Sequence, residues 1–182
     1  EEIARVHGFE NIPALPPVAA NEIRIAPESH RSLFTVRRQL ADLDYQEVVN
    51  YSFIDEASER NFGGSDQIRL LNPIASQMGV MRSSLLGSLL QVLKFNLDRK
   101  TDRVRVFELG RVFLRDATVT DGDSSVAGFA QPMRVAGMAC GPLDRLQWAV
   151  KDRAVDFFDV NVDVQALLAP LYASYEPAEH PA

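Results

Sequence analysis

The stretch from Arg103 to Gly141 limits the possible folds more than any other part of the sequence. Residues 103–115 alternate as in a strand, residues 116–125 form a polar run, and residues 126–141 are apolar again. Two strands joined by a short polar loop pair antiparallel, because a parallel pair needs a long crossover. We interpret Gly110 as a bulge in the first strand. The pattern favours an α+β fold over a doubly wound parallel sheet.

The segments before and after this unit are mostly helical in pattern. Apolar side chains at helical spacing predict a helix that begins at 27–29 and that Asp44 closes in the left-handed conformation. Ser83 or Ser84 is expected to cap a second helix that runs to Asp98. That helix is apolar around much of its circumference, which predicts burial on more than one side. The other predicted elements are a strand at 48–54, a helix from Asp55 to about Phe62, a strand at 67–71 and a helix at 155–168.

A boundary is predicted near the N-terminus. Residues 1–9 have the pattern of the last turns of a helix, which Gly8 would end, and residues 11–17 are rich in proline. We interpret residues 1–20 as the tail of a preceding domain with a linker. Residues 21–182 are then the core domain.

The composition excludes several classes of protein. No apolar run approaches the roughly 18 to 20 residues that cross a membrane. The net charge of −6 disfavours a general nucleic-acid binder, which needs clustered Lys and Arg. Cys140 is the single cysteine, so no internal disulfide can form, which is typical of a reducing cytoplasm.

Catalytic and metal-binding motifs are missing from the sequence. The three histidines are far apart, and there is no zinc-finger, phosphate-loop, dinucleotide-binding or GxSxG pattern. The residues alone therefore indicate a binding or structural module, with no catalytic residue assigned.

Several motifs, taken in order, resemble one known family. They are Leu71–Ser76, Met81–Leu86, Val106–Phe113 and, shortly after Trp148, Val155–Asp159, and Glu1–Pro13 agrees with them. Together they resemble the β subunit of bacterial phenylalanyl-tRNA synthetases, over nearly all of the chain. The part resembled is the central class II synthetase-like domain, which is catalytically inactive in that family.

The resemblance implies a fold, partners and cofactors. The fold would be a class II aminoacyl-tRNA synthetase-like antiparallel sheet flanked by helices, truncated at the C-terminus. The whole enzyme would be a cytoplasmic α2β2 ligase that joins phenylalanine to its tRNA with ATP and Mg²⁺, with the active site in the α subunit. This chain would support assembly with the α subunit, be inactive alone, and bind no cofactor itself. Other domains of the complex would bind the tRNA.

Three residues take pseudo-active-site positions in this resemblance, namely Arg82, Leu114 and Arg115. Leu114 replaces the arginine that grips the α-phosphate in catalytic relatives, and a leucine cannot stabilise charge on phosphorus. Arg115 is one position away, which on a strand places it on the opposite face. Arg82 is expected to support the loop at 72–81, with hydrogen bonds to backbone carbonyls or to a carboxylate of its own domain.

The resemblance also implies a subunit contact and a metal site. The helix at 27–43 resembles the element that forms class II subunit contacts. Glu1 and Glu2 resemble acidic residues that help to bind Mg²⁺ near the α/β contact of the full subunit. We expect no ion on this chain alone, because Mg²⁺ requires near-octahedral oxygen ligands that two terminal glutamates do not supply. The interface candidates are Leu33, Val36, Leu40 and Leu43.

A second function stays open at this point. The chain could be a class II synthetase-like regulatory module that binds an amino acid or a nucleotide. Such a module needs a polar, concave pocket over the sheet. Filling of that space by Leu114, Phe107 and Phe113 would argue against it.

Overall fold

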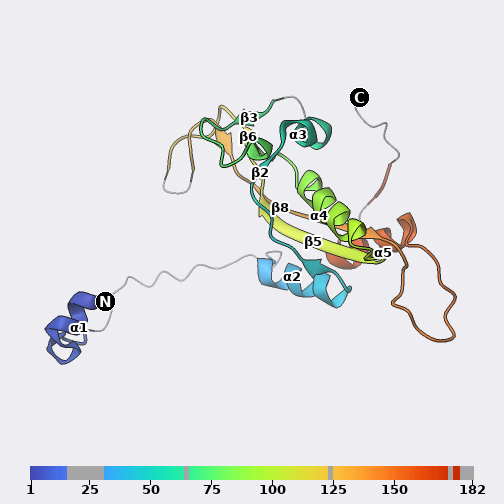
Figure 1. Cartoon of the computed structure of the whole chain (residues 1–182), viewed down its shortest axis with the longest axis horizontal. Helices are drawn as coiled ribbons and strands as arrows, with labels where there is room; N and C mark the ends of the chain where they lie inside the picture. Colours follow the sequence, from blue (N-terminus) through green and yellow to red (C-terminus); the bar gives the residue numbers. More distant parts are fainter. Residues whose placement is uncertain (16–30, 64–65, 123–124, 172–173, 177–182) are drawn as a thin grey trace. The chain divides into compact units, whose positions relative to one another are not determined.

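The computed structural model describes residues 1–15, 31–63, 66–122, 125–171 and 174–176 (Figure 1). By its internal contacts the chain divides into two units, residues 1–30 and 31–182. The first unit contains α1 (Glu2–His7) and the short 3₁₀ helix η1 (Phe9–Asn11). Gly8 ends α1 with a φ of 88°, as the sequence predicts.

The predicted strand–loop–strand unit is confirmed and forms the centre of the second unit. β5 (Val104–Arg111) pairs antiparallel with β8 (Met133–Cys140) along its whole length, with Val104 opposite Cys140 and Arg111 opposite Met133. β1 (Gln46–Glu47) pairs with the other edge of β5 in the parallel direction. The sheet β1-β5-β8 is therefore mixed, and the expectation of a purely antiparallel sheet is wrong at β1.

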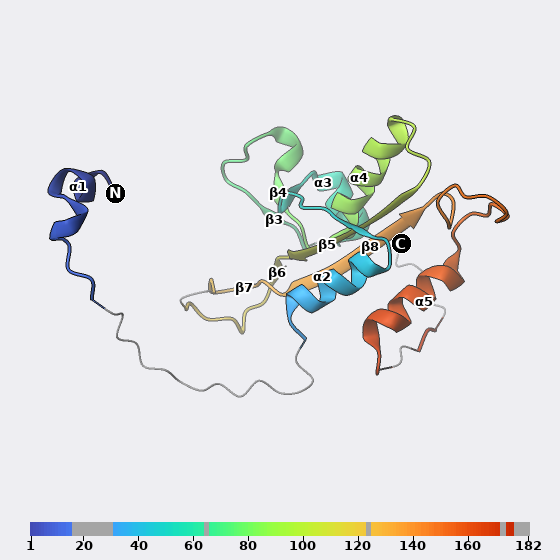
Figure 2. The same ribbon diagram turned by 90° about the horizontal axis from the view of Figure 1, so that it is seen from below.

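One face of this sheet is covered by α4 (Leu86–Asp98), as Figure 2 shows. Leu89 of this helix is completely buried and packs with Val104 and Val106 of β5. These two valines are two residues apart on the strand, so both point to the α4 face.

The opposite face is covered by α2 (Leu33–Asp42) and α5 (Phe157–Leu168), which lie side by side in Figure 2. Leu40 of α2 packs there with Tyr45 and Phe107. Phe107 directly follows Val106 and is one position out of phase with the two valines, so β5 divides its side chains between two cores.

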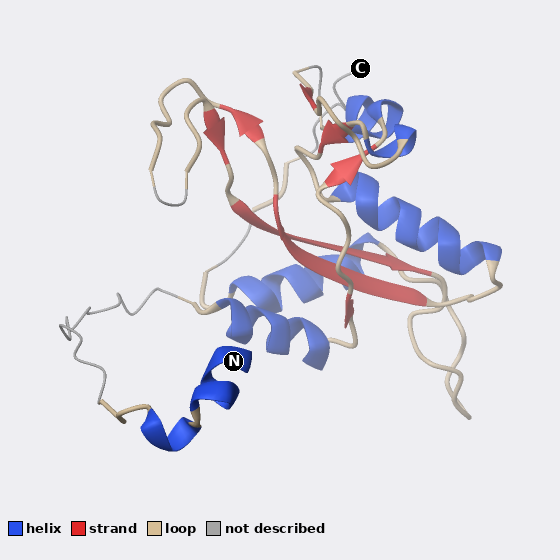
Figure 3. Ribbon diagram, turned by 60° about the vertical axis from the view of Figure 1, so that its left-hand side comes forward, coloured by secondary structure: helices blue, strands red, loops and turns tan. Residues whose placement is uncertain are grey.

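Two smaller sheets lie beyond the end of the central one (Figure 3). One is fully antiparallel in the order β2-β4-β3, and the other is the pair β6-β7. Helix α3 (Glu56–Phe62) and the 3₁₀ helix η2 (Ser76–Met78) belong to the connections of the first. The strands are β2 (Phe53–Ile54), β3 (Ile68–Arg69), β4 (Val80–Met81), β6 (Leu114–Arg115) and β7 (Phe129–Ala130).

Three predicted strands are shorter than expected. Of the strand predicted at 48–54, only the last two residues form a strand, which is β2, because residues 48–52 are irregular. The strand predicted at 67–71 is reduced to β3, and the one predicted at 103–115 divides into β5 and β6. Within this segment, Asn50 donates hydrogen bonds to the carboxylate of Glu108 on β5, described below, and no local pattern encodes such a contact.

The helix ends follow their capping residues. Ser32 caps α2, since its Oγ accepts a hydrogen bond of 3.1 Å from the backbone N of Thr35. The start predicted at 27–29 lies outside the described residues, and residues 31–32 are not helical. Asp44 closes the helix with a φ of 64°, as predicted. Asp55 caps α3, and Asp156 caps α5 in a capping box with Asp159.

Helix α4 follows its predicted burial only in part. Leu89 is buried, but the exposed fraction of Leu86, Leu90, Phe95 and Leu97 lies between 41% and 55%. The helix packs against the sheet through Leu89 and, at its start, against α3 and β2 through Gly87, so burial on more than one side is confirmed there while the rest of its apolar surface is open. Among the described residues, the helices lack the combined length and apolar character that crossing a membrane requires.

Candidate functional site

Arg82, one of the predicted pseudo-active-site residues, is a buried part of the domain interior. It directly follows β4, and 2% of its surface is exposed. Its Nε donates a hydrogen bond of 3.2 Å to the backbone oxygen of Arg111, and its Nη1 lies 2.7 Å from Oε1 of Glu108. The Nη1 contact is an ion pair without an aligned N–H···O hydrogen bond. The predicted own-domain contacts of Arg82 are confirmed, but these partners are on β5 rather than in the loop at 72–81.

Gly110 makes room for this guanidinium. A Cβ added at Gly110 would overlap Nη2 of Arg82 and lie 3.1 Å from Oε1 of Glu108. Gly110 stays in unbroken register, opposite Arg134 of β8. The predicted bulge is therefore wrong: the glycine is required by the close approach of a side chain, not by an extra residue in the strand.

Glu108 connects the buried arginine to the irregular segment at 48–52. Its Oε2 accepts a hydrogen bond of 2.8 Å from Nδ2 of Asn50, and the backbone N of Asn50 lies 3.4 Å from Oε1. The backbone N of Arg82 donates to the backbone oxygen of Ser52 at 3.0 Å. Glu108 is only 2% exposed. The carboxylate thus neutralises the guanidinium and fixes the segment between β1 and β2.

A second buried carboxylate lies at the start of α4, and the sequence analysis did not find it. Glu59 of α3 is 3% exposed and accepts hydrogen bonds from the backbone N and the Oγ of Ser83. Ser83 therefore does not cap α4. Ser84 fills part of that role, since its Oγ accepts a hydrogen bond of 3.2 Å from the backbone N of Leu86. The only sequence signal was a polar residue at a core position of α3.

Leu114 and Arg115 lie in the small sheet β6-β7, on a different strand from Glu108. Leu114 is half-buried and pairs with Ala130. Arg115 is exposed, with its Nε 3.1 Å from Oδ1 of Asp66 and its guanidinium 5.7 Å from the ring centre of Phe129. The structure therefore gives Arg82 and Arg115 separate ion-pair partners.

Three cavities open between described residues, with volumes of about 310, 400 and 270 Å³. None of these three is lined by Arg82, Leu114 or Arg115. Phe107 is 1% exposed and packs against Leu40 of α2, so its side chain fills space over the sheet. The cavity of about 400 Å³ borders β1 and β5 and has polar lining residues that include Asp44, Asn96 and Arg103, so the regulatory alternative would have to use this cavity and not the pseudo-active-site positions.

The four interface candidates, three on α2 and Leu43 directly after it, differ in how far they are buried. Leu40 is 6% exposed and belongs to the core, and Val36 and Leu43 are half-buried beside it. Leu33 is 42% exposed. Phe34, which the sequence analysis did not select, is 72% exposed. Its position next to Leu33, outside the core-facing stripe, was the available signal.

The two candidate metal ligands lie at the N-terminal helix. Glu1 and Glu2 are exposed, and Oε1 of Glu2 lies 2.9 Å from Nη1 of Arg5. Within the described part of the chain, no group of three or more His, Cys, Asp or Glu side chains is arranged to hold a metal ion. Two exposed carboxylates do not complete a Mg²⁺ shell by themselves.

Comparison with known proteins identifies the family. Residues 12–182 match the family model described as the phenylalanyl tRNA synthetase beta chain CLM domain. The chain belongs to this family. Its curated relatives include the phenylalanine–tRNA ligase beta subunits of Ralstonia nicotianae, at 57% identity, and of Cupriavidus pinatubonensis, at 56% identity. Both alignments cover 100% of this chain.

This CLM domain chain spans a little under a quarter of those relatives, 23% of the Ralstonia subunit and 22% of the Cupriavidus subunit. The solved structure of a pyrrolysyl-tRNA synthetase from Desulfitobacterium hafniense aligns with this chain at 17% identity and a TM-score of 0.40. The alignment covers 60% of this chain and 38% of the synthetase chain. That overlap is too weak to support an argument about the CLM domain fold. Its α+β class rests on the elements described above.

Proposed function

We propose that the chain is the non-catalytic core domain of a phenylalanine–tRNA ligase β subunit. In this role it supports assembly with the α subunit into the cytoplasmic enzyme that attaches phenylalanine to its tRNA, using ATP and Mg²⁺. The family match over residues 12–182 and relatives above 50% identity along the whole chain support the proposal. Other domains of the enzyme would bind the tRNA.

The burial of Arg82 is the observation that carries the non-catalytic role. A guanidinium that stabilises charge in a transition state must face the substrate. Arg82 instead lies 2% exposed, paired with Glu108 and hydrogen-bonded to the backbone of Arg111. Leu114 offers no charge, and Arg115 is paired with Asp66. The residues at the three pseudo-active-site positions thus serve the domain itself.

The class II synthetase-like architecture belongs to the same proposal. A central sheet with α4 on one face and α2 with α5 on the other is compatible with it. Residues 1–20 would be the tail of the preceding domain and its linker, and residues 21–182 the core. Glu1 and Glu2 would bind Mg²⁺ only where further oxygen ligands of the full enzyme complete the shell.

Helix α2 is the proposed contact with the α subunit. Its inner side is fixed by Leu40 in the core, while Leu33 and Phe34 leave apolar surface at its N-terminal end. Aromatic side chains are enriched at protein interfaces. Phe34 is therefore the residue on which the assembly role is best tested.

The test uses a complete β subunit that carries this sequence, co-expressed with an α subunit. Phe34→Asp should fold normally and fail to form the tetramer, because it places a charge in a desolvated contact. Leu71→Asp, at a residue that is 98% exposed and lies outside α2, is the matched control and should assemble. Size-exclusion chromatography with light scattering measures assembly, and circular dichroism measures folding. A folded Phe34→Asp subunit that assembles like the unmodified one would contradict the proposal.

A further inference from the structure

Residues 48–52, between β1 and β2, are hydrogen-bonded to the domain along one side. The backbone N of Val48 donates to the backbone of β5 at 2.8 Å, and that of Asn50 donates to a carboxylate of β5 at 3.4 Å. The backbone oxygen of Ser52 accepts from the residue after β4 at 3.0 Å. Bonds at every second residue are typical of an extended chain, in which successive backbone groups point to opposite sides.

Val49 and Tyr51 form the other side of this segment. Within the described ranges, the backbone of neither residue takes part in a hydrogen bond. Their exposed fractions are 90% and 65%. β1 is an edge strand of the sheet β1-β5-β8, so the free backbone groups of these two residues continue its outer edge. An open strand edge can accept a further strand.

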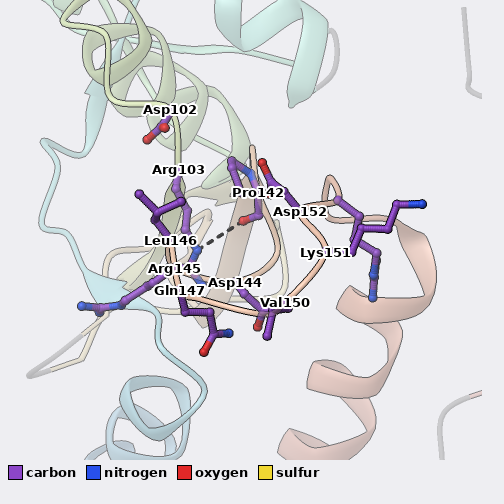
Figure 4. Close-up of a pocket in the computed structure, with 11 residues that line it drawn as sticks. Asp102, Arg103, Pro142, Asp144, Arg145, Leu146, Gln147, Val150, Lys151 and Asp152 are labelled. Carbon is purple, nitrogen blue, oxygen red and sulfur yellow. Dashed lines mark hydrogen bonds between the residues drawn. The ribbon is translucent and has the colours of Figure 1, made fainter.

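The cavity of about 270 Å³ lies beside this edge, since Val49 and Tyr51 belong to its lining, and none of its described lining residues is charged. The other two cavities differ. Most of the side chains around the cavity of about 310 Å³ are charged, as Figure 4 shows, and Asp44, Arg103 and Arg145 line the one of about 400 Å³. Because an unpaired charge is costly to bury, a cavity without charge selects an uncharged ligand.

Ser88 of α4 supplies an available hydroxyl in the uncharged cavity. This residue is 4% exposed and lines the cavity. Its Oγ makes no hydrogen bond to any described residue. A buried hydroxyl without a partner costs free energy, and a ligand that bonds to it removes that cost.

Three amide side chains complete the polar lining. Nδ2 of Asn50 and Nε2 of Gln91 donate to carboxylates at 2.8 and 3.3 Å, so their amide oxygens remain as acceptors. Oε1 of Gln77 accepts from a serine hydroxyl at 3.3 Å, so its amide nitrogen remains as a donor. A carboxamide both donates and accepts and matches this set, whereas a carboxylate only accepts.

We propose that this edge and cavity bind an extended, uncharged peptide segment. The segment adds as a strand along Val49 and Tyr51, and it inserts a carboxamide side chain, that of Asn or Gln, into the cavity beside Ser88. Backbone hydrogen bonds supply affinity in such a site, and the cavity supplies specificity. The proposal goes beyond the assembly role and does not use the α2 contact.

A nucleic acid fits these observations less well. Aromatic and amide side chains can also bind an unstacked base. Single-stranded nucleic acid, however, requires cations along its backbone, and the cavity lining has none. The unpaired strand edge has a direct counterpart in a peptide and none in a base.

Calorimetry with three matched peptides tests the proposal on a complete β subunit that carries this sequence. The first probe is the capped peptide Thr-Val-Gln-Val-Thr, which should bind with a dissociation constant of about 1 mM or less. The same peptide with Glu in place of Gln should bind about tenfold more weakly, because it brings a charge into an uncharged cavity. A copy of the first peptide with N-methyl groups on its three central residues should not bind, because it lacks the donors for strand pairing.

Absence of binding by the Gln peptide would overturn the proposal. Equal binding of the Gln and Glu peptides would overturn the role of the cavity, and equal binding of the N-methylated copy would overturn the strand addition. An uncharged-peptide site also predicts that a single-stranded oligonucleotide leaves the Gln peptide bound, so displacement by it would count against the proposal.

Ser88→Ala tests the cavity from the side of the protein. It should weaken binding of the Gln peptide by about threefold to tenfold, the effect of one lost hydrogen bond. It should not lower the thermal stability, because the hydroxyl has no partner in the free domain. Thr120→Ala, at an exposed residue between β6 and β7, is the control and should leave binding unchanged. Unchanged binding by Ser88→Ala would contradict the assigned position of the carboxamide.

Hydrogen exchange locates the added strand. With the Gln peptide bound, amides in residues 47–53 should exchange more slowly, because Val49 and Tyr51 gain backbone partners. Protection elsewhere without protection here would overturn the proposal. The measurements use the β subunit without its α subunit, so assembly of Phe34→Asp can overturn the α2 contact and leave this site standing, and the reverse also holds.

Discussion

An arginine–carboxylate ion pair lies near each end of β5, and one pair is buried while the other is exposed. Near its C-terminal end, the Arg82–Glu108 pair has side chains that are 2% and 3% exposed. Before its N-terminal end, the Asp44–Arg145 pair has side chains that are 40% and 76% exposed. Both are Arg–carboxylate contacts of similar length, 2.7 and 2.6 Å. Their difference in solvent contact gives them different roles.

Desolvation explains the difference. Removing one partner of a buried pair leaves an uncompensated charge in the interior, whereas water and salt screen an exposed pair. The inner pair therefore holds Asn50 and the strands together, so that its loss affects the whole domain. The outer pair attaches the loop at residues 143–153 to Asp44, with little effect on the core.

The largest expected effect is at the inner pair. Glu108→Ala leaves the Arg82 guanidinium buried without a carboxylate and should lower the free energy of unfolding by about 3–5 kcal/mol. Urea denaturation followed by circular dichroism measures this change. Asp66→Ala removes the exposed partner of Arg115 and should change stability by about 0–1 kcal/mol. Equal losses in the two variants would show that burial does not distinguish these pairs.

A smaller effect is expected where the strand backbone approaches Arg82. Gly110→Ala inserts a methyl group into the space of the guanidinium and should destabilise the domain by about 1–3 kcal/mol. Gly79→Ala is the matched control, because a Cβ there meets only one atom, at an ordinary distance of 3.7 Å. Thermal unfolding compares the two. An unaffected Gly110→Ala variant would mean that Arg82 moves aside freely.

The smallest effect is at the outer pair and depends on pH. Hydrogen bonding from Arg145, with Arg103 beside it, lowers the pKa of Asp44 from 3.8 to about 2. The pair therefore contributes its stability above about pH 4 and loses it as the pH falls through 2. Asp44→Asn should be less stable than the unmodified chain by under about 1 kcal/mol near neutral pH, since both side chains are partly exposed.

The measurement for this variant is urea denaturation at several pH values. The difference between Asp44→Asn and the unmodified chain should shrink towards zero as the pH approaches 2. Asparagine tolerates the left-handed φ of 64° at this position, so the substitution changes charge without imposing backbone strain. A difference that stays constant across this range would assign the effect to something other than titration of Asp44.

Local sequence signals predicted the helices and strands, whereas long-range contacts decided how these elements pair and which side chains contact one another. Asp55 as a cap, Asp44 as a left-handed residue and the antiparallel pairing of β5 with β8 followed from short sequence patterns. The parallel pairing of β1 could not be predicted, because its partner lies about sixty residues away on β5. Ser83 had the composition of a cap, yet Glu59 takes its hydroxyl.

Arg82 illustrates the difference between what the sequence predicted and what the tertiary structure decided. The sequence by itself determined the family, the α+β class and the expectation that Arg82 binds its own domain. Only the tertiary structure decided that the partner is Glu108, that Gly110 provides the space, and that Leu40 is core while Phe34 is surface. The physical reason is that periodicity and capping act within a few residues, whereas burial and charge pairing depend on segments that meet only when the chain has folded.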